Sequence, residues 1–355
     1  MKVGIIGATG YTGLSLLRDL AGRPSTEVTL VTSRKEAGGK LIKIHPSLAG
    51  YPGYRELILE DPNLLEKIKE KEPARFPEVI FLAVKHKAAM ALAPRVLNLG
   101  SKVIDLTGDF RLKEKELYPK WYKFEHECPE YLSQAIYGLP ELHRDKIKNA
   151  RLVANPGCYP TSVILALAPL CQEGLIRQGT TIMVDSKSGV SGAGREPSLG
   201  NIFCEVSENF RAYKVVGHQH TPEMAQELSF LAKGRISLSF TPHLVPMNRG
   251  ICTTTYVLVQ KVSGLSQITE IYQDYYKNEP FVRLKEQGQI PETLDVRGTN
   301  FCDLGLFYDE DEDVVKIISV IDNLCRGAST QAMVNLNILS GAEENLGVNL
   351  VALRP

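Results

Sequence analysis

The sequence predicts an α/β protein of two domains, a doubly wound parallel sheet followed by an α+β domain with a mixed sheet. Its 355 residues suit two domains of ordinary size. Short apolar strands alternate with helical patterns up to about residue 150, which is the rhythm of βαβ units. From about Arg151, runs of alternating β-branched residues replace this rhythm and indicate mixed or antiparallel strands.

Each predicted element follows from a local pattern. In the first domain, KVGII (2–6) is a strand, and the helix at 10–24 is closed by Gly22 and Pro24. Further elements of this domain are strands at 27–33, 78–84 and 102–108 and a helix at 86–100. The second domain is predicted to have strands at 180–186, 235–240, 252–260 and 314–322 and helices near 222–233 and 265–277.

The last helical pattern, at 326–342, follows the second sheet and is expected to pack back on the first domain. The predicted division is therefore 1–156 plus about 324–355 for the first domain, and 157–323 for a catalytic and oligomerisation domain.

Composition excludes several classes of function. Lys plus Arg and Asp plus Glu both number 41, so the net charge is zero and no nucleic-acid partner is expected. The longest apolar run is too short to span a membrane, and the amino-terminal stretch lacks the layout of a signal peptide. Seven cysteines without CxxC spacing indicate a reducing compartment. We therefore expect a cytoplasmic protein without a membrane partner.

A glycine-rich loop stands between the first strand and the first helix. GxxGxxG is a variant of the dinucleotide fingerprint, in which glycines close the turn and let the backbone approach a pyrophosphate. The free N–H groups at the start of the helix stabilise the negative charge of a bound phosphate. The first domain is thus predicted to be Rossmann-type, with a plain strand-to-helix turn as the alternative. The predicted cofactor contacts of this loop are Gly7, Thr9, Gly10, Tyr11, Thr12 and Gly13.

The end of the second strand favours NADP over NAD. NAD-binding domains usually place an acidic residue there to bind the ribose. In this chain the position is held by Ser33, Arg34 and Lys35, whose hydroxyl and cations suit a 2′-phosphate. The alternative interpretation is a solvated turn.

Residues 154–162, ANPGCYPTS, place a thiol where a turn becomes a helix. Pro156 and Gly157 make the turn, and Cys158 precedes Pro160, a favoured first helical residue. A helix start stabilises a thiolate, and its N–H groups are able to hold a developing oxyanion. Cys158 is therefore either a nucleophile or a buried structural residue.

Two histidines precede a predicted helix. Thr221 is the expected N-cap of that helix and Gly234 its end. Near this helix start, His218 and His220 are expected to stay neutral and to suit proton transfer. A metal pair or a structural role are the alternatives, and we expect no metal.

Three further stretches hold candidate ligands for a substrate. The loop 185–198 carries Arg195, which suits a carboxylate or phosphate. The stretch 108–112 follows a sheet strand, where open α/β folds bind ligands, and holds Arg111. The stretch 241–251 lines the site or builds a subunit contact. Surface loops and salt bridges are the alternatives.

The motifs together resemble one family. GATGYTG, ANPGCYPTS, SGVSGAG, GHQHTPE and TPHLVPMNRGI are similar to the type 1 N-acetyl-gamma-glutamyl-phosphate reductase family, of the aspartate-semialdehyde dehydrogenase-like superfamily. The resemblance runs from the first strand to the final helix. It implies that Cys158 attacks an acyl phosphate, that NADPH reduces the thioester to a semialdehyde, and that His220, or else His218, moves the proton.

The same resemblance implies binding residues and an assembly. Asn323 would meet the nicotinamide, and the oligomer would be a homodimer or homotetramer built through the second sheet. Cys325 departs from the family pattern, which leaves fine cofactor contacts open. The implied substrate ligands are Arg111, Asn155, Gly157, Ser188 and Arg195.

Three other functions fit parts of the sequence. A lysine-pathway relative would reduce an aminoadipyl phosphate by the same mechanism and would need room for one more methylene. A non-catalytic NADP-binding redox sensor would keep the glycine loop without needing Cys158 near His220. A cysteine hydrolase would leave the glycine loop unexplained.

Overall fold

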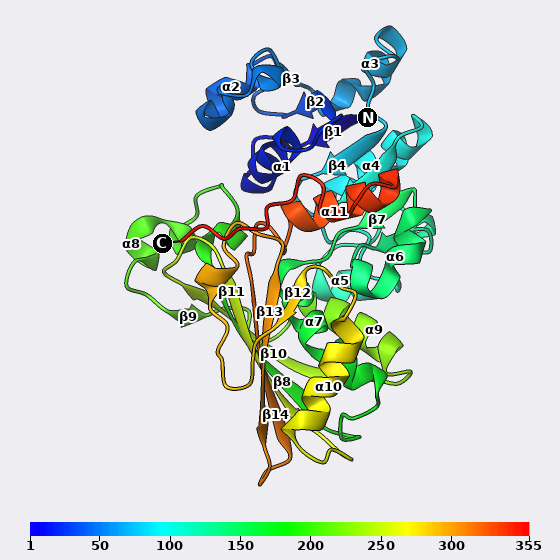
Figure 1. Ribbon diagram of the computed structural model, residues 1–355. Helices are drawn as coiled ribbons and strands as arrows, with labels where there is room; N and C mark the ends of the chain where they lie inside the picture. Colours follow the sequence, from blue (N-terminus) through cyan, green and yellow to red (C-terminus); the bar gives the residue numbers. More distant parts are fainter. Residues whose placement is uncertain (355) are drawn as a thin grey trace. The chain divides into compact units, whose positions relative to one another are not determined.

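The computed structural model describes residues 1–354, which form two compact units (Figure 1). Unit 1 comprises Met1–Gly157 and Ala328–Asn349, and unit 2 comprises Cys158–Gly327 with residues 350–354. The sequence placed residues 324–327 and those after 349 in the first domain. The structure groups both segments with unit 2, where the Leu353 N–H donates to the Arg297 carbonyl at 3.0 Å.

Unit 1 is built on a parallel sheet of seven strands. The strand order turns back at β1, because β2 and β3 lie to one side of it and β4, β5, β7 and β6 to the other. Ligands bind at such a switch point, outside the carboxyl ends of the strands. In spatial order the strands are β3 (Leu59–Glu60), β2 (Glu27–Thr32), β1 (Lys2–Ile6), β4 (Val79–Leu82), β5 (Lys102–Asp105), β7 (Leu152–Ala154) and β6 (Ile136–Tyr137).

The carboxyl-terminal helix belongs to unit 1 and is buried on all sides. Helix α11 (Ser329–Ser340) contacts α1 (Tyr11–Ala21) and α6 (Pro140–Lys148). Its polar side chains bind neighbouring groups: Ser329 Oγ donates to Asp19 Oδ2 at 2.9 Å, and Asn335 Nδ2 to the Gly138 carbonyl at 2.9 Å. The other helices are α2 (Leu41–Ile44), α3 (Leu65–Lys71), α4 (Ala88–Asn98) and α5 (Leu117–Trp121), with 3₁₀ turns at 46–48, 52–54, 62–64 and 129–131.

Unit 2 is built on a mixed sheet. Two pairs, β12 with β13 and β8 with β10, are parallel, and the remaining pairs are antiparallel. In spatial order the strands are β12 (Val282–Leu284), β13 (Cys302–Asp309), β14 (Val314–Ile321), β11 (Ile251–Leu258), β8 (Thr181–Gly189), β10 (Ser237–Val245) and β9 (Arg211–Ala212).

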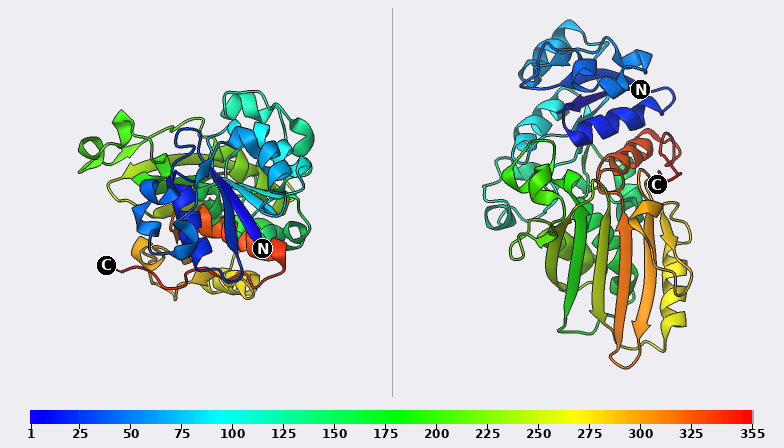
Figure 2. Two further views of the ribbon diagram at one scale, coloured as in Figure 1. Left: turned by 90° about the horizontal axis from the view of Figure 1, so that it is seen from above. Right: turned by 90° about the vertical axis from the view of Figure 1, so that its left-hand side faces the viewer.

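Helices cover one face of this sheet. They are α7 (Cys158–Gln172), α9 (His220–Leu231) and α10 (Leu265–Tyr276), which contact strands on that side. Figure 2 (right) shows the strands in front of these helices. Met183 and Tyr256, paired on neighbouring strands, are 52% and 43% exposed. The short helix α8 (Phe203–Val206) and 3₁₀ turns at 190–193, 199–201 and 293–295 lie in the connections.

Helix α7 is the centre of unit 2. Every residue from Tyr159 to Cys171 is buried, as expected of a helix that is apolar all round. Pro169 inside this helix lacks an N–H, which leaves the Leu165 carbonyl without its usual donor. The Tyr276 hydroxyl donates to that carbonyl at 2.5 Å, so α10 supplies the missing hydrogen bond. This hydrogen bond joins α10 to the middle of α7.

No helix within residues 1–354 is long and apolar enough to cross a membrane.

Candidate functional site

Cys158 is the first residue of α7, two positions earlier than the predicted start at Pro160. Its thiol is half-buried, whereas Cys128, Cys171, Cys302 and Cys325 are fully buried. The N–H groups of the first helical turn have no partner inside the helix, and the helix dipole is positive there. Both effects favour a thiolate at Cys158.

A glycine from a distant part of the sequence packs against this residue. A Cβ built on Gly327 would lie 2.7 Å from the Cys158 Cβ and 2.5 Å from the Asn323 carbonyl oxygen. Only glycine therefore fits at this position. The Asn323 amide lies beside it, with Oδ1 accepting from the Gly250 N–H at 2.8 Å and Nδ2 donating to Ser191 Oγ at 2.9 Å.

Tyr159 brings the two predicted histidines to the start of α7, next to Cys158. Its ring centroid lies 5.8 Å from that of His218 and 6.0 Å from that of His220. The Tyr213 hydroxyl donates to the Tyr159 hydroxyl at 3.1 Å, which ties the segment before the histidines to α7. The structure thus collects Cys158, His218 and His220 within unit 2.

The start of α9 differs from the expectation. His220, not Pro222, is the first helical residue, and Thr221 lies inside the helix rather than capping it. His218 explains the difference, because its Nδ1 accepts the His220 N–H at 3.1 Å and its carbonyl accepts the Thr221 N–H at 3.0 Å. The prediction of Thr221 as N-cap was therefore wrong.

This geometry separates the two histidines. His218 is 4% exposed and packs against the rings of Tyr159, Tyr213 and Phe240. Burial, together with the smaller effect of the Lys214 cation, lowers the pKa of His218 to about 4. With Nδ1 accepting a backbone N–H, neutral His218 carries its proton on Nε2.

We expect His218 to make the protein less stable as the pH falls from about 6.5 to about 4. The pKa of His218 is lower in the folded than in the unfolded chain, so acid protonates the unfolded chain first. The contribution of neutral His218 to the free energy of unfolding is complete above pH 6.5. Its full loss in acid is on the order of 3 kcal/mol. Urea unfolding at pH 4 to 7 measures it. The difference in free energy of unfolding between wild type and His218→Asn should shrink towards acid pH. If the free energies of the two proteins change in parallel with pH, the lowered pKa of His218 is contradicted.

The predicted dinucleotide loop follows β1. Gly7 has φ +93°, and a Cβ there would lie 2.3 Å from the Ala83 carbonyl oxygen. A Cβ on Gly13 would lie 2.7 Å from the carbonyl oxygens of Gly7 and Ala8, whereas one on Gly10 would meet only Gly7 O at 4.0 Å. The loop is closed tightly and remains open around Gly10, which fits the approach of a pyrophosphate. Thr9 and Thr12 are half-buried there, and Tyr11 is 39% exposed.

The 2′-phosphate candidates lie at the carboxyl end of β2. Ser33 is buried, and its Oγ accepts the Glu36 N–H at 3.3 Å. Arg34 and Lys35 are exposed. Two cations beside a buried hydroxyl fit a phosphate better than a ribose hydroxyl.

The five predicted substrate ligands have different surroundings. In unit 1, the Arg111 guanidinium is buried and donates to the carbonyls of Asn155 and Leu106 at 2.8 and 3.0 Å. The Asn155 side chain donates to the Ala328 carbonyl at 3.2 Å and accepts from Asn335 at 3.0 Å. Gly157 is buried and is the last residue of the first segment of this unit. In unit 2, Ser188 is buried, and Arg195 lies in an exposed loop.

Three further polar residues near these elements were not predicted from the sequence as site residues. His45 is buried, and its Nε2–H donates to the Ala8 carbonyl in the glycine loop at 3.0 Å. Asp109 caps the start of α4 by accepting the N–H groups of Ala89 and Met90 at 3.0 and 3.3 Å. Asp322 is fully buried beside Asn323. Asp322 directly follows the apolar strand β14, and a charged residue at the end of such a strand could have marked it as a candidate.

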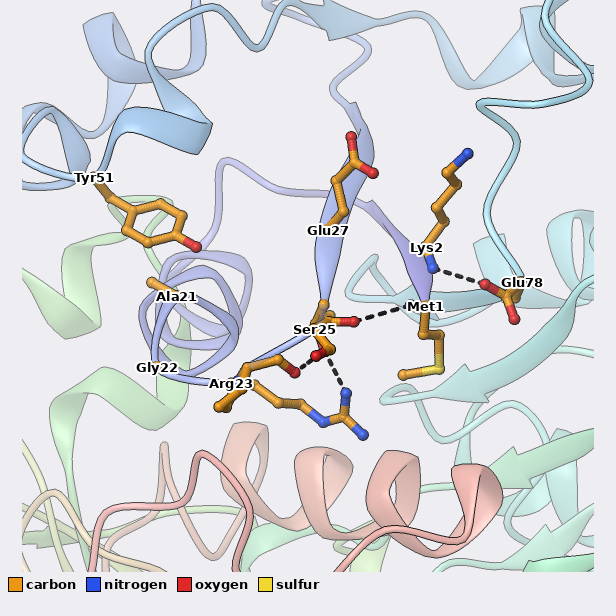
Figure 3. Close-up of a pocket in the computed structure, with 11 residues that line it drawn as sticks. Met1, Lys2, Ala21, Gly22, Arg23, Ser25, Glu27, Tyr51 and Glu78 are labelled. Atoms are coloured by element: carbon orange, nitrogen blue, oxygen red, sulfur yellow. Dashed lines mark hydrogen bonds between the residues drawn. The ribbon is translucent and has the colours of Figure 1, made fainter.

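A pocket of about 550 Å³ lies away from these residues. It is lined by residues at the amino ends of β1 and β2, including Lys2 and Glu27, with Glu78 accepting the Lys2 N–H at 2.8 Å (Figure 3). The glycine loop follows the carboxyl end of β1, so this pocket is not the predicted cofactor site. Among residues 1–354, no group of three or more His, Cys, Asp or Glu side chains is placed to hold a metal ion.

The chain is an oxidoreductase of the semialdehyde dehydrogenase class. Residues 2–150 match the model of the semialdehyde dehydrogenase NAD binding domain, and residues 158–323 match the model of its dimerisation domain. Aspartate semialdehyde dehydrogenase II from Vibrio cholerae has the same fold, with a TM-score of 0.71 at 19% identity over 96% of this chain and 98% of that one. The enzyme from Candida albicans, solved with NADP, gives 0.70 at 14% identity over 97% and 99%.

Curated relatives define the family within this class. N-acetyl-gamma-glutamyl-phosphate reductases from Geotalea daltonii and Geobacter sulfurreducens are 49% and 48% identical, each over 100% of both chains. The one from Pelotomaculum thermopropionicum is 47% identical over 100% of this chain and 99% of its own. The chain belongs to the N-acetyl-gamma-glutamyl-phosphate reductase family, which confirms the resemblance, the fold class and the dinucleotide-binding domain predicted from the sequence.

Proposed function

We propose that the protein reduces N-acetyl-gamma-glutamyl phosphate to N-acetyl-glutamate 5-semialdehyde, with NADPH as the reductant and phosphate as the other product. The observation that carries this proposal is the 46–49% identity, over essentially full length, to curated reductases of that name. These relatives favour the glutamyl substrate over the aminoadipyl one and catalysis over a sensor role. The reaction would serve arginine biosynthesis in the cytoplasm.

Cys158 is the proposed nucleophile. Its sulfur forms a bond to the acyl carbon, the bond from that carbon to the phosphate oxygen breaks, and phosphate leaves. The N–H groups at the start of α7 stabilise both the thiolate and the oxyanion that forms on the carbonyl. The product of this step is a thioester on Cys158.

His220 is the proposed acid and base. Its half-buried ring contacts Tyr159, the residue next to the nucleophile. It would accept the thiol proton when Cys158 attacks. After reduction of the thioester, the oxyanion re-forms the aldehyde carbonyl, the bond from carbon to sulfur breaks, and His220 would return the proton to the departing sulfur. His218 is the weaker candidate, because its Nδ1 is held by the His220 N–H and burial keeps its ring neutral.

The residues of unit 1 support NADP(H) as the cofactor. The glycine loop would bind the pyrophosphate, and Ser33, Arg34 and Lys35 would bind the 2′-phosphate. Asn323 would bind the nicotinamide amide after exchanging its bond to Ser191. When bound, the cofactor supplies the hydride that reduces the thioester.

Arg195 and Ser188 are the proposed ligands for the substrate's anionic groups. The exposed loop of Arg195 allows the guanidinium to reach a phosphate or carboxylate. Asn155 and Gly157 are proposed for the oxyanion side. Arg111 is also a proposed ligand, although its guanidinium already binds two carbonyls and would have to exchange them.

We propose further that the protein works as a homodimer or homotetramer joined through the open face of the unit 2 sheet. The match of residues 158–323 to a dimerisation domain and the exposed Met183 and Tyr256 on that face support this assembly.

The reverse reaction tests the function. N-acetyl-glutamate 5-semialdehyde, NADP and phosphate should give a rise in NADPH absorbance that requires phosphate, with NAD much less effective. A rise only with the aldehyde that is one carbon longer would identify an aminoadipyl substrate. No rise with either aldehyde would contradict the proposal.

A further inference from the structure

A buried carboxylate organises the loop between β14 and α11. Asp322 is 0% exposed, and its two oxygens accept different backbone N–H groups. Oδ1 accepts the N–H groups of Leu324 and Cys325 at 2.8 and 3.1 Å, and Oδ2 accepts that of Gly298 at 2.7 Å. Arg249 Nη1 lies 3.3 Å from Oδ2 and balances the charge.

The loop that Asp322 holds ends at the nucleophile. The Gly327 N–H donates to the Asp322 carbonyl at 3.0 Å, so the backbone turns back within six residues. Gly327 is the residue whose built Cβ would lie 2.7 Å from the Cys158 Cβ. Asn323, the proposed nicotinamide ligand, directly follows Asp322. One carboxylate therefore fixes the backbone that carries Asn323 and that contacts Cys158.

Only an aspartate meets this combination of donors. Each carboxylate oxygen accepts at least one backbone N–H, and both must act as acceptors. An asparagine has the same shape but offers one oxygen and one NH₂ group. That NH₂ group would face either the Gly298 N–H or the N–H groups of Leu324 and Cys325. A donor would then face a donor, and at least one of these hydrogen bonds would be lost.

We propose that Asp322 is a positioning residue for catalysis, which holds the loop 322–327 so that Gly327 sets the place of the Cys158 side chain. The inference rests on the proposed function, in which Cys158 is the nucleophile. Asp322 has no role in the chemistry of its own, since its oxygens are occupied by backbone N–H groups and Arg249.

The test is Asp322→Asn beside a matched control, Asp303→Asn. Asp303 is another 0% exposed aspartate of unit 2, and it accepts from Arg283 at 2.6 and 3.0 Å. Its substitution should lower the melting temperature and leave kcat unchanged. For Asp322→Asn we expect kcat to fall about 10- to 100-fold, since small displacements of a reacting group cost rates of that order. The KM for the acyl phosphate substrate should stay within about twofold of wild type.

A second measurement separates positioning from loss of stability. Alkylation of Cys158 by iodoacetamide, followed on the Cys158 peptide, should slow in Asp322→Asn and not in Asp303→Asn. If both variants lose stability while kcat and alkylation stay at wild-type values, the inference is overturned. If Asp322→Asn does not fold, Gly327→Ala tests the same contact from the other side. Wild-type kcat and alkylation in that variant would overturn the inference.

Failure of the inference is distinct from failure of the proposed function. Cys158→Ser, assayed in parallel, should have no turnover. If it retains turnover, the covalent mechanism on which the inference rests falls, whereas the proposed function falls only if the wild-type protein forms no NADPH in the reverse reaction. If Cys158→Ser is inactive while Asp322→Asn is fully active, only the positioning role falls.

Discussion

Cys158→Ser should lower the rate of NADPH-dependent reduction by at least about 1,000-fold. A serine hydroxyl is far less acidic than a thiol, so the helix start no longer supplies an anionic nucleophile. An ester formed on serine would also be a poorer hydride acceptor than the thioester. Steady-state turnover in the reverse direction, with NADP, semialdehyde and phosphate, measures the loss.

Two controls accompany this variant. Binding of NADPH, followed by its fluorescence, should be unchanged, because the predicted cofactor loop belongs to unit 1 and Cys158 to unit 2. Cys204→Ser changes an exposed thiol and should leave turnover at the wild-type rate. Substantial turnover in Cys158→Ser would exclude the covalent mechanism.

Gly13→Ala should weaken NADPH binding by about 10- to 100-fold. The added Cβ would meet the carbonyl oxygens of Gly7 and Ala8 at 2.7 Å, and backbone atoms have little room to move. Relief of such a contact costs about 1–3 kcal/mol, and it would move the start of α1 away from the loop that faces the pyrophosphate. Fluorescence titration with NADPH measures the dissociation constant.

Gly22→Ala is the matched control at the other end of the same helix. A Cβ there would meet only the Asp19 carbonyl oxygen at 3.5 Å, and the backbone of Gly22 is helical. Binding should therefore stay at the wild-type value. Equal affinity of the two variants would show that the start of α1 does not shape the cofactor site.

The main strands of unit 1 could be predicted because a buried parallel strand is an apolar run. KVGII and EVIFLAV are such runs, and β1 and β4 lie within them. The two-residue strands β3 and β6 are too short to have a pattern. In unit 2 the strand β13, with the sequence CDLGLFYD, was missed because an aspartate and a glycine interrupt its apolar residues.

Candidate site residues could be proposed from the sequence where residue types and local order suggest the chemistry. A thiol at a helix start and a His-x-His pair before a helix are visible within ten residues of sequence. The contacts of Gly327 with Cys158 and of His45 with Ala8 join segments far apart in the chain, and no local pattern marks them. The carbonyl partners of Arg111 could not be predicted either, because a buried guanidinium and a substrate ligand look alike in a sequence.

The place of α11 has a consequence for synthesis of the chain. This helix packs against α1 and α6 but comes about 180 residues after α6 ends, with the segment Cys158–Gly327 of unit 2 between them. While the ribosome makes unit 2, the faces of α1 and α6 that α11 will cover remain exposed. Most of the residues that form the core of unit 2 are therefore synthesised before α11, the last helix of unit 1. Premature termination near residue 328 should therefore yield a chain in which unit 2 folds and unit 1 is prone to aggregate.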